Sequence, residues 1–307
     1  MWEDLTNADA GCIIIRKEKG RLSMYVSVDF EQPLYALGLK NAACAVKAAG
    51  FDAVDFSFKT KTGLAMLTCD LWQENAKRTR QVLDEQGLVC NQAHAPMGFS
   101  AKNKMRENDL QFALLLRCFD FAKTLGAKIV VVHAVTDVSP VDFIPYNLRF
   151  YKSLEKYARI AGVKIGVENL FTYDERYHRF DGVFERSEKL TSFIQKLRSD
   201  VFVACVDTGH AALTGTPPEK YIAGMNASVL GALHLHDNDG KDDLHLLPTR
   251  GTLDWESILS ALKKLGYRGD ITFEIMFYLE KFKAEELPLA LRQAGALGKR
   301  FKEYLTE

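Results

Sequence analysis

Five apolar runs in this chain each end in a side chain that can bind a divalent metal ion. The runs are rich in β-branched residues, and their last residues are His133, Glu168, Asp207, His234 and Glu274. The last four of these offer three carboxylates and one imidazole. Such a mostly oxygen donor set suits Mn²⁺, Mg²⁺, Co²⁺ or Zn²⁺. The sequence therefore predicts a metal site whose ligands are spread over more than a hundred residues.

A closed parallel barrel would bring these residues together, because the C-terminal ends of its strands lie on one rim, where its active sites sit. The chain alternates strand and helix patterns, which is typical of a parallel sheet. Strands are predicted at residues 24–30, 51–58, 88–94, 128–133, 164–168, 201–207, 229–234 and 270–274. Helices are predicted at residues 33–49, 71–86, 104–125, 145–162, 186–197, 218–225, 254–265 and 284–304.

The eight strand–helix units show no break in composition between them. They predict an α/β protein, a single (β/α)8 TIM barrel that spans residues 24–307. Residues 1–23 precede the first predicted strand and are expected to form a short N-terminal extension. An open, doubly wound sheet is the structural alternative. It is disfavoured because no glycine-rich phosphate loop follows an early strand.

The composition restricts the class of partner. The 307 residues include 40 Lys and Arg and 40 Asp and Glu, and this balance argues against nucleic acid as a partner. No apolar run reaches membrane-spanning length, so no membrane association is expected. The six cysteines form no Cys-x-x-Cys pair, and the N-terminus lacks a signal-peptide pattern. Both features are typical of a cytoplasmic protein with reduced thiols.

The two glutamates are candidates for acid–base catalysis. Glu168 and Glu274 each end a buried strand, where a carboxylate is costly unless it is paired or bound to a metal. A nearby Lys or Arg would also satisfy either of them, and Asp207 alone would fit a helix cap. With a metal ion that polarises a carbonyl, one glutamate removes a carbon-bound proton and the other returns it.

Several histidines have more than one interpretation. His234 and His236 point to the same face of a strand, so they compete for one ligand position. His94 and His133 also end predicted strands. Taken alone, each is expected to be a histidine of the barrel interior whose ring is hydrogen-bonded. Asp243 and His245 are expected in a loop, where Asp and His side chains are usually only solvated. By themselves they are therefore weak evidence for a metal site. The Tyr-rich stretch 171–180, with His178 inside it and assigned no role, is expected to form a lid.

A series of short motifs resembles the xylose isomerase-like barrel superfamily, which includes sugar isomerases, sugar epimerases and endonuclease IV. The motifs occur in the order of that superfamily and extend over predicted strands three to eight. They are His-Ala-Pro (94–96), Val-Val-His-Ala (131–134), Gly-Val-Glu-Asn-Leu (166–170), Val-Asp-Thr-Gly-His-Ala (206–211), His-Leu-His-Asp-Asn-Asp-Gly (234–240), Asp-Leu-His-Leu (243–246), Arg-Gly-Thr-Leu-Asp-Trp (250–255) and Phe-Glu (273–274).

The resemblance implies roles for individual residues. In this superfamily the seventh-strand ligand is a His that is followed by two residues and then an Asp, a pattern that favours His234 with Asp237. The register of His236 with Asp239 fits the same pattern and stays open. The other ligands of a single metal fall on Glu168, Asp207 and Glu274. The resemblance also makes Glu168 and Glu274 the acid–base pair and gives His210 a substrate contact.

The similarity to endonuclease IV implies additional metal ligands, because this sequence has a candidate residue for every ligand position of that enzyme's three-zinc cluster. The additional candidates are His94, His133, His210, His236, Asp243 and His245. In a sugar enzyme, His94 and His133 are instead expected to contact substrate. Arg250 stands in Thr-Arg-Gly, where the superfamily usually has Gly-x-Gly, and is expected to bind a phosphate or sugar oxygen.

The sequence as a whole predicts a divalent-metal-dependent isomerase or epimerase of a sugar or sugar phosphate. The alternatives are a zinc phosphoesterase similar to endonuclease IV, a dehydratase of sugar-derived or inositol-derived substrates, and a binding barrel without activity. The expected partner is a small sugar, without nucleic acid or membrane. The resemblance also leads us to expect a homo-oligomer.

Overall fold

The computed structural model describes residues 24–59, 61–174 and 179–307. The predicted extension, residues 1–23, and His178 lie outside the described residues. Eight parallel strands form one sheet, which confirms the predicted TIM barrel. The strands, in sheet order, are β10 (Ile271–Phe273), β1 (Val26–Asp29), β2 (Ala53–Ser57), β3 (Val89–His94), β4 (Ile129–Val132), β5 (Lys164–Glu168), β8 (Phe202–Asp207) and β9 (Leu230–His234).

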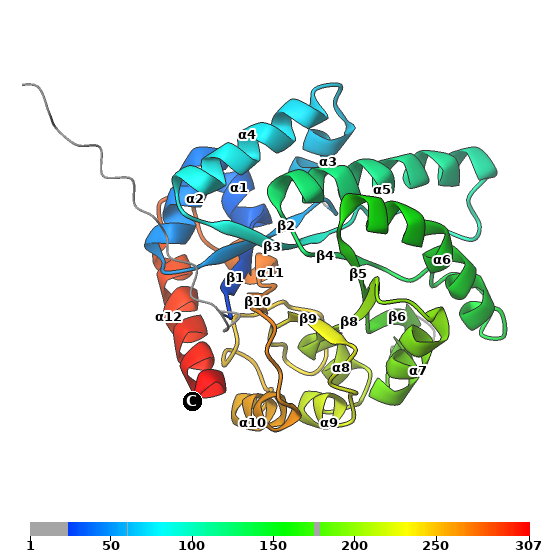
Figure 1. The fold of residues 1–307 in the computed structure, drawn as a ribbon. Coiled ribbons are helices and arrows are strands. Elements are labelled where there is room, and N and C mark those ends of the chain that lie inside the picture. The colour runs from blue at the N-terminus through cyan, green and yellow to red at the C-terminus, as the bar shows by residue number, and fades with distance from the viewer. Residues whose placement is uncertain (1–23, 60, 175–178) are drawn as a thin grey trace, which may run out of the picture.

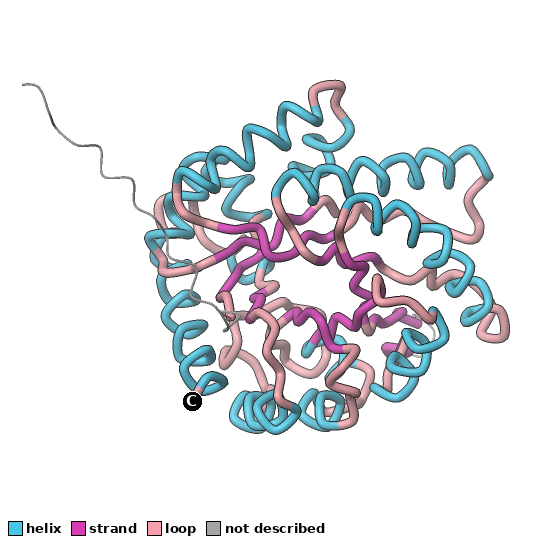
Figure 2. Tube along the Cα trace, in the orientation of Figure 1, coloured by secondary structure: helices cyan, strands magenta, loops and turns pink. Residues whose placement is uncertain are grey.

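The sheet curves into a ring whose first and last strands meet (Figure 2). Leu235 follows β9 directly and pairs with Phe273 of β10. Its backbone N–H donates to the carbonyl oxygen of Thr272 at 2.9 Å, and its own carbonyl accepts from Glu274 at 3.2 Å. These bonds place the ends of β9 and β10, and with them His234 and Glu274, next to each other.

Helices surround the ring (Figure 1). Among the described helices, none has the length and apolar composition needed to cross a membrane. Their bounds are α1 (Glu31–Leu37), α2 (Leu39–Ala48), α3 (Lys61–Thr68), α4 (Trp72–Glu85), α5 (Met105–Leu125), α6 (Phe143–Ala161), α7 (Ser187–Leu197), α8 (Thr208–Leu213), α9 (Pro218–Ala223), α10 (Trp255–Leu265), α11 (Met276–Leu279) and α12 (Leu287–Thr306).

Some of the predicted helices differ from the observed ones. The helix predicted at residues 33–49 is divided into α1 and α2 at Gly38, whose φ of 71° is readily adopted only by glycine. The helix predicted to begin at Pro145 begins at Phe143 instead. Gly126, by contrast, ends α5 in the left-handed conformation that its position predicted.

An antiparallel hairpin lies outside the barrel sheet and was not predicted. It consists of β6 (Leu170–Asp174) and β7 (Arg179–Val183), and it follows β5 after a single residue. The sequence analysis predicted a lid over residues 171–180 without assigning strands to it. Leu170 and Phe171 of the hairpin line the cavity at the rim, so this segment is next to the site.

One buried carboxylate anchors the loop between β9 and α10. Asp237 accepts hydrogen bonds from the backbone N–H groups of Thr249 at 3.0 Å and Leu253 at 3.1 Å. It also accepts from the indole Nε1 of Trp255 at 2.7 Å. The predicted ligands at residues 243–245 lie within this loop, so their placement depends on the Asp237 carboxylate.

We expect Asp237→Ala to lower the free energy of unfolding by roughly 3 kcal/mol, because it leaves several buried N–H groups without an acceptor. Urea denaturation of metal-free protein measures this change. The control is Asp242→Ala in the same loop, whose exposed side chain predicts a change below about 0.5 kcal/mol. Equal effects of the two substitutions would contradict the anchoring role.

Candidate metal centre

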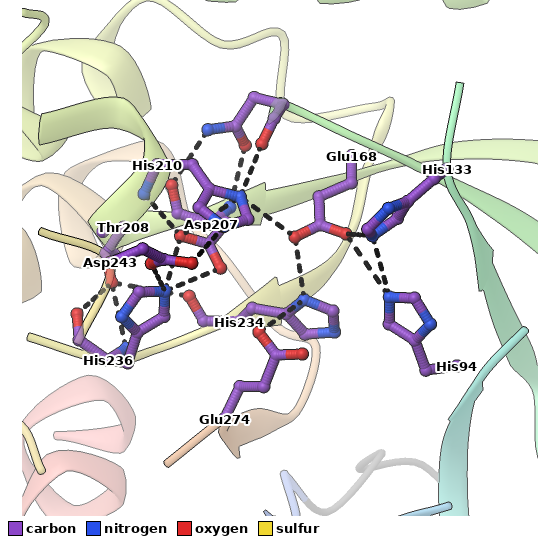
Figure 3. A network of polar contacts seen from close by, with 12 residues as sticks. His94, His133, Glu168, Asp207, Thr208, His210, His234, His236, Asp243 and Glu274 are labelled. Atoms are coloured by element: carbon purple, nitrogen blue, oxygen red, sulfur yellow. Dashed lines mark hydrogen bonds and ion pairs between the residues drawn. The ribbon is translucent and has the colours of Figure 1, made fainter. Parts of the chain in front are cut away.

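The C-terminal rim of the barrel gathers the predicted ligands around one cavity. The cavity has a volume of about 430 Å³. Its polar floor includes His133, Glu168, His210 and Glu274, and apolar side chains such as Phe171 form its walls. Figure 3 shows Glu168 at the centre, with the His94–His133 pair on one side and His210 and His234 on the other.

The four residues predicted to bind a single metal lie together. The ligand atoms of Glu168, Asp207, His234 and Glu274 are all within 4.8 Å of one another, and every one of these side chains is buried. His234 Nδ1 is 3.1 Å from Glu168 Oε1 and 3.4 Å from Glu274 Oε2. Two carboxylates from β5 and the end of β10 thus face one ring nitrogen.

A second group consists of His94, His133 and Glu168. The two Nε2 atoms of the histidines are 3.0 Å apart, and His133 Nε2 is 3.1 Å from Glu168 Oε2. That buried oxygen nevertheless accepts no aligned hydrogen bond. A buried carboxylate oxygen that lacks a hydrogen bond and lies beside two imidazole nitrogens is an arrangement that a metal ion satisfies.

A third group consists of His210, His236, Asp243 and His245. His245 Nε2 is 3.1 Å from Asp243 Oδ2, and His210 Nε2 is 3.7 Å from the same oxygen. His236 Nε2 lies 2.9 Å from Asp207 Oδ1, so its ring joins this group to the first one. The structure thus places His234 and His236 in different groups of candidate ligands.

Glycine is needed at position 209 for His236 to take this place. A Cβ atom on Gly209 would lie 2.0 Å from Cε1 of the His236 ring. Real Cβ atoms do not approach another heavy atom so closely, so any side chain at 209 would displace the imidazole. The Gly in Val-Asp-Thr-Gly-His-Ala therefore makes room for a candidate ligand from the segment that follows β9.

Backbone carbonyls fix the orientation of three of the rings. The Nδ1 atoms lie 2.9–3.0 Å from carbonyl oxygens: His94 from Ala95, His210 from Asn169 and His245 from Glu274. A carbonyl oxygen only accepts, so each Nδ1 carries the hydrogen in that contact. This leaves Nε2 toward the shared group, as is usual for metal-binding histidines.

His234 is oriented from the opposite side. Its Nε2 is 3.6 Å from Oδ2 of the buried Asp55 on β2, and Gln92 donates a hydrogen bond of 3.0 Å to the same oxygen. Nδ1 therefore faces the carboxylates. The sequence analysis missed Asp55, because a lone acidic residue inside a strand pattern shows no partner in the sequence.

The charges of His234 and Glu168 influence each other's pKa values. Burial disfavours the charged ring of His234, yet Cys205, Glu274 and Glu168 around it raise its pKa well above the ordinary value. Burial also opposes ionisation of Glu168, but His234 and its other histidine neighbours hold the pKa of that carboxyl well below its ordinary value. Protonated rings here occupy the electrostatic position that a bound cation would take.

Lys59 and Arg250 differ in their position relative to the cavity. Lys59, which the sequence analysis missed, follows β2 by two residues and contacts Glu274 Oε1. Arg250, predicted to bind a substrate oxygen, is exposed and is not among the described residues that line the cavity. Its backbone N–H donates to Leu247 at 3.0 Å. The structure therefore does not bring Arg250 to the other candidates.

Comparison with known proteins identifies the family. A family model described as the xylose isomerase-like TIM barrel matches residues 44–293. The chain belongs to this family. Its membership confirms the resemblance that the motifs at the strand ends indicated.

Proteins of known sequence or structure are similar to this chain over most of its length. An uncharacterised protein from Sinorhizobium fredii is 26% identical over 78% of this chain and 82% of its own length. The D-psicose 3-epimerase of Enterocloster bolteae is 25% identical over 75% of this chain and 74% of its own. A solved structure of IolI with a bound zinc atom is 16% identical, covers 88% of this chain and 96% of its own, and has a TM-score of 0.68.

We expect metal-free protein to lose stability as the pH rises above about 6.5. Burial lowers the pKa values of His210 and His245, but their carboxylate neighbours raise them above the ordinary value of 6.5. A raised folded-state pKa contributes stability that is complete below the unfolded pKa and lost as the pH rises through the folded pKa. The loss amounts to about 1.4 kcal/mol per pH unit for each histidine in that range.

Urea denaturation between pH 6 and pH 9 in the presence of a chelator measures this slope. The same series on His210→Gln should give a smaller slope, because one of the coupled rings is gone. A free energy of unfolding that stays constant or increases over this range would contradict the coupling.

Proposed function

We propose that this protein is a divalent-metal-dependent isomerase or epimerase of a sugar. The observation that carries the proposal is the position of Glu168 and Glu274, two carboxylates that border the same ring nitrogen of His234 and also line the cavity. Two carboxylates beside one metal position suit this reaction, because one can remove a proton from the carbon next to a carbonyl and the other can return a proton. The similarity to a D-psicose 3-epimerase supports this reaction class.

The residues present fit a divalent cation. The buried oxygens Glu168 Oε2 and Asp243 Oδ1 accept no hydrogen bond, and the surrounding donors are carboxylates and imidazoles. Glu168, Asp207, His234 and Glu274 would hold the ion. When bound, it would polarise the substrate carbonyl and the hydroxyl beside it. The zinc atom in the related IolI structure supports a metal in this scaffold.

The two glutamates then divide the proton transfer. The pKa values of Glu168 and Glu274 are both held low: burial opposes ionisation, but His234 is the first of the neighbours that favour it. Both carboxyls are therefore ionised at neutral pH, and each can accept a carbon-bound proton. One ionised carboxylate would remove the proton and become a carboxylic acid. The other, once it has taken up a proton from water, would deliver that proton to the carbon, which returns the substrate with altered configuration or carbonyl position. Proton exchange with water would then restore both carboxyls to their starting states.

The remaining residues bind the substrate and limit its access to water. His210 lines the cavity and can donate to a substrate hydroxyl. The rings of Phe171 and Phe277 pack edge-on against His210 and His245, each at a centroid distance of 5.0 Å. These apolar walls exclude water from the floor. The cavity volume lies in the range of small-molecule sites.

Glu274→Gln is expected to slow solvent exchange of the substrate's carbon-bound proton by at least about 10²-fold, because an amide accepts no proton at neutral pH. The experiment follows deuterium incorporation from D₂O into a panel of ketohexoses and ketopentoses by NMR. Mn²⁺ titration of the same variant should show that most of the metal affinity is retained. Unchanged exchange would remove Glu274 from the acid–base pair.

A second candidate, a zinc phosphoesterase, is favoured by the number of ligand groups. Besides the first group, His94 and His133 lie with Glu168, and His210, His236, Asp243 and His245 form another group. Each of these two groups could accept a further ion. Two or three zinc ions suit hydroxide attack at phosphorus.

Elemental analysis of protein purified without a tag or chelator distinguishes the two candidates. We expect about one Mn, Mg, Co or Zn per chain, as one ion suffices for the isomerase. Two or three zinc ions per chain, together with chelator-sensitive hydrolysis of bis(4-nitrophenyl) phosphate or nicking of an abasic duplex, would replace the isomerase with the phosphoesterase.

A further inference from the structure

Lys59 is a charged residue of the cavity that neither the motifs nor the predicted acid–base pair includes. It follows β2 at the C-terminal rim, and only 11% of its side chain is exposed. Its Nζ contacts Oε1 of Glu274. Among the described residues that line the cavity, Lys59 is the only Lys or Arg. Its position there therefore requires an explanation beyond solubility.

The surroundings of Lys59 favour a permanent charge. Burial alone would lower its pKa, but the carboxylates of Glu274, Asp29 and Glu168 raise it above the ordinary value. Asp29 ends β1 and is itself buried, and Glu274 is the carboxylate that the ammonium group contacts.

The contact with Lys59 gives the two carboxylate oxygens of Glu274 different partners. Oε1 is paired with the ammonium group. Oε2 lies 3.4 Å from His234 Nδ1 and 3.5 Å from His245 Nδ1, on the side of the candidate ligands. A carboxylate that is free to rotate could offer both oxygens to one cation. Lys59 opposes that arrangement in this structure.

We propose that Lys59 is a positioning residue that makes Glu274 a one-oxygen ligand and keeps Oε1 for proton transfer with the substrate. This inference rests on the proposed isomerase activity and adds a residue to it. Oε1 has more than one acceptor direction, and Lys59 occupies one of them. The other stays directed at the cavity, which both residues line.

Replacement of Lys59 should change metal binding and proton transfer in opposite directions. In Lys59→Met, Glu274 loses a competing cation and can offer both oxygens, so Mn²⁺ should bind about tenfold more tightly. Oε1 is then turned toward the ion, and exchange of the carbon-bound proton should slow by at least about tenfold. A merely structural role would weaken metal binding and exchange together.

The experiment titrates Mn²⁺ into metal-free wild-type, Lys59→Met and Lys59→Arg proteins and follows free Mn²⁺ by electron paramagnetic resonance. Deuterium exchange of D-psicose is measured on the Mn²⁺-loaded proteins. Lys59→Arg keeps a cation and should lie closer to wild type in both measurements. The matched control is Lys61→Met, an exposed lysine two residues away, which should change neither.

Tighter Mn²⁺ binding with slower exchange in Lys59→Met supports the proposal. Unchanged or weaker binding would overturn it, and so would tighter binding with unchanged exchange. If wild-type protein exchanges no proton of any ketose, the isomerase proposal fails. The Mn²⁺ titration then still decides whether Lys59 controls the carboxylate of Glu274.

Discussion

Negative charge buried at the C-terminal rim is the constraint on which the rest of this site depends. Glu168, Asp207 and Glu274 are each at most 1% exposed, and they lie beside one another where parallel strands end. Isolated buried carboxylates cost several kcal/mol each unless a cation or hydrogen-bond donors compensate them. Without such compensation the barrel would be destabilised at its functional end.

The fold compensates this charge with an organised shell. Asn169 connects the ends of β5 and β8, since its side chain bonds both the backbone N–H and the carbonyl of Asp207 at 2.8 and 2.9 Å. Backbone carbonyls direct the histidine rings, and Asp237 fixes the loop that carries His245. These contacts hold the donor atoms in place before any cation binds, which is the preorganisation that a metal centre requires.

The sequence predicted the elements whose position follows from periodicity. The carboxylates and histidines at strand ends were identified because a parallel barrel places every such end on one rim. Lys59 and Asp55 were missed, since their importance depends on contacts with Glu274 and His234 that are distant in the sequence. The hairpin after β5 was missed because the Tyr-rich stretch lacks clear alternation, and Arg250 was expected at the cavity from a motif alone.

We propose that Glu168, Asp207, His234 and Glu274 surround a divalent cation. Anomalous diffraction at the manganese edge, from crystals grown with Mn²⁺, would locate that ion. We expect an anomalous peak within coordination distance of the donor atoms of these four residues. A cavity floor without such a peak, with protonated histidines compensating the carboxylates instead, would contradict it.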